Sequence, residues 1–204
     1  MDLQLRKLQA SVDALIHHRK ELSTSTGAFA KSCAILGNCE EHTSLSCALS
    51  QLADTEEKVE HVFNEQVNND FVYLSDLIRD YINLIGAVKE IFHQRVKVFQ
   101  TWQHAQQQLT RKREAKARAE LANRPDKVAL ANEEVHEWEA KVNRGQEEFE
   151  NISKTIKQEL EKFELARVSD FKASIIKYME SLLETQLQLI KHWEGFLPEA
   201  KAIS

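Results

Sequence analysis

Apolar residues recur alternately three and four positions apart along almost the whole of this 204-residue chain. The pattern occupies three tracts, at about residues 2–36, 43–122 and 126–196, with the seven-residue period of helices packed lengthwise in coiled coils. Only 5 Gly and 2 Pro are present, and a strand-rich fold would need many more turn residues. The sequence therefore predicts an all-α protein, an elongated antiparallel coiled coil of three long helices.

Two short breaks separate the three tracts. Gly37 suits the end of the first helix, and Thr43 can cap the start of the second. Pro125 suits the first turn of the third helix, and Pro198 is expected to end that helix. We therefore expect only two turns in the chain.

Short connections make neighbouring helices antiparallel. Residue i of the middle helix should then lie opposite about residue 249 − i of the last helix. From its length, the first helix covers the middle helix only up to about residue 77, and the last helix only beyond about residue 172. We expect three helices side by side at one end and two helices at the other.

The three-helix end carries more apolar surface than one chain can bury. Surplus apolar surface on an elongated chain implies a partner, most simply a second copy related by a two-fold axis. We therefore predict an obligate dimer. The residues expected at its interface are Phe71, Leu74, Leu77, Ile78, Leu182, Leu189 and Trp193.

Residues 111–127 form the most basic segment, with a net charge of 7 − 3 = +4 in a chain of net charge −5. One interpretation is a solvated helix end, because cations complement the dipole there. The other is a tip that binds an anionic membrane surface. Nucleic acid is not expected, because no aromatic residues are interleaved for base stacking. The candidate membrane-binding residues are Arg111, Lys112, Arg113, Lys116, Arg118, Arg124 and Lys127.

No residue pattern predicts an enzyme, a cofactor or a metal site. Two Glu-x-x-His pairs, beginning at residues 90 and 133, have the spacing found in di-iron helical bundles. The antiparallel pairing, however, places them far apart. The three cysteines lack a paired C-x-x-C spacing for zinc and suit reduced thiols in the cytosol. The longest apolar run has about five residues, which is far short of a membrane span.

Several motifs resemble the C-terminal BAR domain of the sorting nexins. The motifs are HRKEL at 18–22, FAKS at 29–32, ALSQLA at 48–53, NRPDK at 123–127 and FLPEAKAI at 196–203. The resemblance covers essentially residues 1–204 and implies a single BAR domain that forms a crescent-shaped dimer. Such domains sense or induce membrane curvature, and the resemblance assigns membrane contact to the basic residues near the end of the second helix.

The resemblance also implies partners and a location. It suggests homodimers, possibly heterodimers with related sorting nexins, and binding to anionic, phosphoinositide-containing membranes. It further suggests a retromer-associated coat that tubulates endosomes and returns receptors to the Golgi. The protein would be cytoplasmic and peripheral on early endosome membranes. The alternative from the residues alone is a coiled-coil scaffold or tether without lipid contact.

Overall fold

A computed structural model describes residues 1–203 of the chain. Its elements are α1 (Asp2–Cys39), α2 (Thr43–Asp70), the π-helical turn η1 (Phe71–Ser75), α3 (Asp76–Leu121) and α4 (Pro125–Lys201). The described residues contain no strand, and α2, η1 and α3 follow one another without a break. The all-α fold of three long helices is thus confirmed. None of the helices in residues 1–203 is long and apolar enough to cross a membrane.

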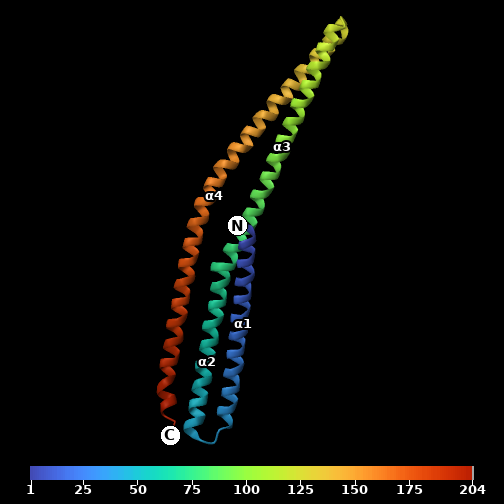
Figure 1. Ribbon diagram of the computed structural model, residues 1–204. Coiled ribbons are helices and arrows are strands. Elements are labelled where there is room, and N and C mark those ends of the chain that lie inside the picture. The colour runs from blue at the N-terminus through green and yellow to red at the C-terminus, as the bar shows by residue number, and fades with distance from the viewer. Residues whose placement is uncertain (204) are drawn as a thin grey trace. The chain divides into compact units, whose positions relative to one another are not determined.

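The chain divides into two compact units. Unit 1 contains Met1–Asn83 and the chain from Arg167 onward, and unit 2 contains Leu84–Ala166. In unit 1, α1, α2 and the C-terminal part of α4 run lengthwise, whereas unit 2 is a hairpin of α3 and α4 (Figure 1). The three-helix portion therefore ends close to the limits of about 77 and 172 expected from helix lengths.

The register of α4 agrees with the predicted antiparallel pairing. In unit 2 the rule places about residue 154 opposite Arg95, and Arg95 Nε donates a hydrogen bond to Ser153 Oγ at 2.8 Å. In unit 1 it places about residue 168 opposite Tyr81, whose hydroxyl donates to Asp170 Oδ2 at 2.7 Å. Helix lengths and one turn are thus sufficient to predict the pairing to within a few residues.

Two expected helix ends are wrong. Helix α1 continues through Gly37, because this glycine serves close packing: a Cβ there would lie 3.1 Å from Ser50 Oγ of α2. Helix α4 continues through Pro198 to Lys201. Proline removes one backbone donor and crowds the preceding turn, but so near the helix end this interrupts only a single hydrogen bond.

Unit 2 is held together at its centre by a cluster of aromatic rings. Trp102 of α3 stacks on Phe149 of α4 with ring centroids 5.6 Å apart, and Phe99 lies 5.2 Å from the same ring. Gly145 lies one turn before Phe149, and a Cβ on it would lie 3.1 Å from Trp102 Cβ and 3.3 Å from its Cα. The glycine therefore lets the two helices approach at the tryptophan.

We expect Gly145→Leu to lower the free energy of unfolding by about 2 kcal/mol, because the new side chain overpacks against the backbone of α3. The matched control is Gly86→Leu, since nothing lies within 4 Å of a Cβ at Gly86. Relief of the glycine penalty should make that variant about 0.5–1 kcal/mol more stable. Urea denaturation measures both, and equal effects would contradict the close approach at Gly145.

Candidate functional site

Helix α1 carries two apolar columns of seven-residue spacing, and only one of them faces the interior of unit 1. Leu5, Val12 and Cys33 are buried, and the adjacent buried column contains the small residues Ser23, Ala30 and Gly37. These small residues bring α1 close to α2. The remaining column is between 36% and 55% exposed and consists of Leu8, Leu15, Leu22, Phe29 and Leu36.

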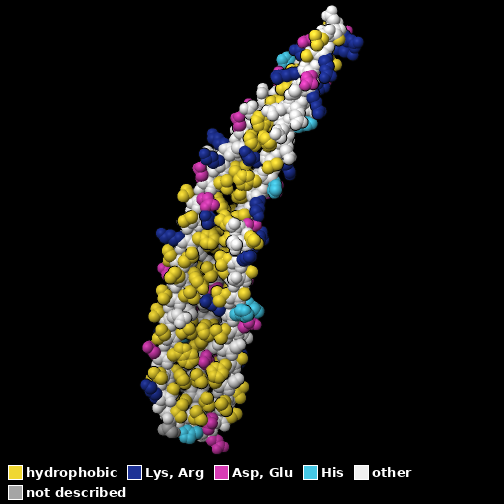
Figure 2. Space-filling view, in the orientation of Figure 1, with side chains coloured by type: hydrophobic (Ala, Val, Ile, Leu, Met, Phe, Trp, Pro, Cys, Tyr) yellow, Lys and Arg dark blue, Asp and Glu magenta, His cyan; other side chains and the backbone are white. Residues whose placement is uncertain are grey.

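Helix α4 presents a second exposed apolar row in unit 1, between 45% and 64% exposed: Ile176, Met179, Leu183, Leu187, Ile190 and Leu197. Leu22 of α1, Phe63 of α2 and Leu182 of α4 line one groove. Hydrophobic side chains accordingly gather over this unit in the space-filling view (Figure 2). We call the two exposed rows, together with this groove, the apolar face.

The residues predicted for the dimer interface have different environments in unit 1. Phe71 and Trp193 are 41% and 40% exposed, and Leu74, Leu77, Leu182 and Leu189 are half-buried. Ile78 is only 2% exposed, so it packs inside its own unit and is removed from the candidate interface. The exposed column of α1 was missed, because the sequence pattern merged it with the buried column beside it.

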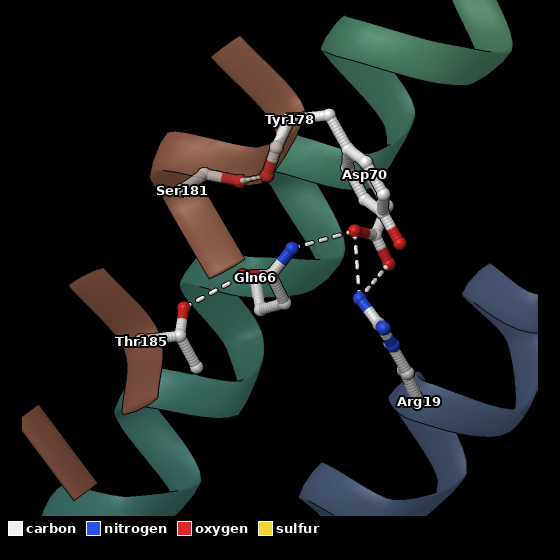
Figure 3. Close-up of polar contacts among 6 residues, drawn as sticks. All are labelled: Arg19, Gln66, Asp70, Tyr178, Ser181 and Thr185. Carbon is white, nitrogen blue, oxygen red and sulfur yellow. Dashed lines mark hydrogen bonds and ion pairs between the residues drawn. The ribbon is translucent and has the colours of Figure 1, made fainter. Parts of the chain in front are cut away.

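Unit 1 also contains a buried polar layer between its helices (Figure 3). The carboxylate of Asp70 on α2 is 0% exposed, and Arg19 Nη1 of α1 donates to its two oxygens at 2.7 and 2.6 Å. Gln66 Nε2 donates to Asp70 at 2.6 Å, and the Thr185 hydroxyl of α4 donates to Gln66 Oε1 at 2.6 Å. One connected network thus joins α1, α2 and α4.

The π-helical turn η1 follows Asp70 directly. A π turn holds one extra residue and leaves a backbone carbonyl without its usual helical donor. The hydroxyl of Ser174 on α4 donates to the carbonyl of Tyr73 in this turn. Ser75, which is 0% exposed, accepts a hydrogen bond from Gln9 of α1 at 2.8 Å. Side chains from two other helices therefore stabilise the turn.

The structure pairs four of the seven predicted membrane-binding cations with carboxylates in unit 2. Lys112 contacts Glu134 and Arg113 contacts Glu139, both at 2.8 Å across the hairpin. The hydrogen bond from Arg113 lowers the pKa of Glu139. Lys116 and Arg118 form longer pairs, of 3.8 and 3.9 Å, with glutamates on their own helix.

The end of the hairpin is less basic than the sequence segment alone. Residues 111–139 contain seven Lys and Arg and seven Asp and Glu, so their net charge is 7 − 7 = 0. In the described part of the chain, Arg111, Arg124 and Lys127 form no ion pair. Of the seven predicted cations, Arg111 in α3, Arg124 in the turn and Lys127 at the start of α4 are therefore free to meet an anionic surface.

The described residues contain no group of three or more His, Cys, Asp and Glu side chains that could hold a metal ion. Cys33 is buried, whereas Cys39 and Cys47 are exposed, and none of the three forms a disulfide. The candidate functional surfaces are the apolar face of unit 1 and the hairpin of unit 2 with those three unpaired cations.

Comparison with known proteins gives strong matches over nearly the whole chain. The family model described as Vps5 C terminal like matches residues 1–199. Sorting nexin-2 of Bos taurus is 59% identical over 201 residues, which cover 98% of this chain and 39% of that protein. Sorting nexin-1 of Homo sapiens is 52% identical over 201 residues, covering 98% and 38%. The chain spans about two fifths of the length of these relatives.

Solved structures with low sequence identity share the fold. The Imp2 F-BAR domain has a TM-score of 0.56 at 12% identity, with 98% of this chain and 77% of that chain covered. The N-terminal I-BAR domain of IBARa from D. discoideum has a TM-score of 0.53 at 12% identity, with 98% and 82% covered. The fold is therefore that of BAR domains.

We expect Arg19→Met to lower the free energy of unfolding by about 3–5 kcal/mol, because it leaves the buried Asp70 carboxylate without a counter-charge. Arg19→Met combined with Asp70→Asn should recover most of that loss, because no buried charge remains. Chemical denaturation at one protein concentration measures the double-mutant cycle. Additive losses would show that the two side chains are not coupled.

Proposed function

This chain belongs to the Vps5 C-terminal-like family of BAR-domain sorting nexins, and from that membership we propose that it is a dimerising module that binds curved anionic membranes. The observation that carries the proposal is the apolar face of unit 1. Its exposed side chains follow helical spacing along two helices, so they form a continuous surface rather than scattered contacts. A continuous apolar surface of this kind is stable in water when a second surface covers it.

The occupant of the apolar face is a second copy of this chain, related by a two-fold axis. In a two-fold dimer both protomers present the same residues to the interface. Each protomer therefore contributes the column from Leu8 to Leu36 and the row from Ile176 to Leu197. Of the residues predicted from the sequence, Phe71, Leu74, Leu77, Leu182, Leu189 and Trp193 are retained in this interface. A related sorting nexin with the same columns can replace the second copy.

The membrane is bound by the hairpin of unit 2 through its unpaired cations. Near an anionic bilayer each Lys or Arg contributes about 1 kcal/mol. Arg111, Arg124 and Lys127 would therefore supply about 3 kcal/mol per protomer and about 6 kcal/mol per dimer when both ends touch one surface. The paired cations Lys112, Arg113, Lys116 and Arg118 contribute less, because neighbouring carboxylates already neutralise them. A dimer that needs both contacts responds to the curvature of the surface.

Family membership supports a more specific cellular role. We propose that the chain acts in a protein that is peripheral on the cytoplasmic face of early endosomes. There it would bind phosphoinositide-containing membranes and join a retromer-associated coat in tubulation and endosome-to-Golgi receptor retrieval. A scaffold or tether without lipid contact is the competing function, and vesicle binding separates the two.

We expect Leu187→Glu to convert the dimer to a monomer, because each dimer then buries two carboxylates in place of two leucines. The dissociation constant should rise about a thousandfold. The matched control is Leu130→Glu, on the same helix and equally exposed at 62% but outside the apolar face. Sedimentation equilibrium measures both, and a wild-type chain that is monomeric at micromolar concentration would contradict the proposal.

We expect the triple variant Arg111→Gln, Arg124→Gln, Lys127→Gln to pellet at least tenfold less with anionic vesicles at about 100 mM salt. A control triple removes the same charge from exposed lysines of unit 1, at Lys31, Lys172 and Lys177. An equal loss in both triples would indicate general charge attraction rather than contact through the hairpin end. Unchanged pelleting of the first triple would favour the scaffold.

A further inference from the structure

The turn between α3 and α4 bears the most exposed large apolar side chain of residues 1–203. Leu121, the last residue of α3, is 89% exposed, and Leu130, in the second turn of α4, is 62% exposed. Neither leucine contributes much to the packing of unit 2. Any polar residue with good helix propensity would serve the hairpin as well as Leu121 does.

The backbone holds Leu121 in a defined place. The amide of Arg124 donates to the Ala119 carbonyl at 3.3 Å, and the amide of Asn123 donates to the Glu120 carbonyl at 3.1 Å. Asn123 has a positive φ of 53°. These features form a Schellman motif, which closes the end of a helix through its own carbonyls. The turn is therefore a well-defined structure at the end of the hairpin, and Leu121 projects from it.

Each leucine has a cation on its own helix face, although Glu133 and Glu134 also share the face of Leu130. Arg118 precedes Leu121 by three residues and Lys127 precedes Leu130 by three, a spacing that places each pair on one helix face. Arg124 lies in the turn itself. At this end of the hairpin, Figure 2 shows hydrophobic side chains among Lys and Arg, with Asp and Glu beside them. An apolar group with cations close to it suits the boundary of an anionic bilayer, where phosphates lie outside the acyl chains.

We propose that Leu121, assisted by Leu130, inserts into the acyl region of an anionic bilayer and anchors the end of the hairpin there. The inference rests on the proposed function, because it describes how the same surface meets the membrane. It adds an interaction that charge does not supply. With a net charge of zero over residues 111–139, electrostatic attraction at this end is weaker than the basic segment predicts.

Vesicle binding of Leu121→Ser tests the insertion. Loss of the apolar side chain should weaken partitioning onto vesicles with about 30% phosphatidylserine by about tenfold. The factor should be the same at about 100 mM and about 500 mM salt, because salt screens charges and not apolar burial. The matched control is Leu165→Ser, a 76% exposed leucine on α4 away from the turn, with the dimer verified by sedimentation.

A fluorescent label gives an independent readout. An environment-sensitive fluorophore at Leu121→Cys, in a chain with Cys39→Ser and Cys47→Ser, should shift its emission to the blue when vesicles are added. Vesicle binding without a shift would overturn the insertion, and so would equal partitioning of Leu121→Ser and the wild-type chain.

The triple charge variant separates this inference from the proposed function. If the triple variant Arg111→Gln, Arg124→Gln, Lys127→Gln binds vesicles more weakly while Leu121→Ser does not, the proposed membrane binding is supported and the insertion is wrong. If neither change affects vesicle binding, the proposed membrane contact is wrong as well. A loss in both supports the two together.

Discussion

The buried carboxylate of Asp70 determines how unit 1 is assembled. With no exposure to water, it is stable only with partners, and these come from Arg19 of α1 and Gln66 of α2. Through Gln66 the same network reaches Thr185 of α4. Because α1 must aim Arg19 at Asp70, its small residues face α2 and its leucine column faces outward. This ion pair, together with the buried small residues of α1, thus leaves the leucine column for a partner.

The π-helical turn η1 changes the rotation of the middle helix in the same region. An inserted residue rotates the following helix by about 100° relative to the preceding one, just where α1 ends its contact with the middle helix. The cost is an unsatisfied carbonyl and buried polar side chains. Ser174 supplies the missing donor to Tyr73, and Gln9 donates to Ser75. Polar residues at apolar positions of these helices therefore have a structural use.

The seven-residue spacing predicts much of the fold, since it depends only on helix geometry. It indicated the three helices, and the position of the turn between the last two predicted the pairing of Arg95 with the region of Ser153. The spacing could not show which α1 column faces inward, because Leu5 and Leu8 look equally suitable in the sequence alone. The inward face is set in the structure, where Ser23, Ala30 and Gly37 allow α1 to approach α2 closely. The spacing also could not predict that Glu134 and Glu139 would pair with Lys112 and Arg113, because carboxylates more than twenty residues away in sequence lie beside the basic segment only in the hairpin.

Those ion pairs change how the end of unit 2 should be understood. Carboxylates beside a basic segment reduce its attraction to any polyanion, so the local charge is too low for charge alone to provide strong binding. They also hold α3 against α4 near the turn, which reduces the freedom that Leu121 would lose on entering a bilayer. An apolar group on a pre-formed turn loses less conformational entropy on binding than one on a mobile loop. The ion pairs within the hairpin therefore weaken its long-range, salt-sensitive attraction to anions. In its place, the pre-formed turn favours a short-range apolar contact that only the bilayer can supply. Such a contact distinguishes a membrane from other anionic surfaces, which the basic segment alone would not do.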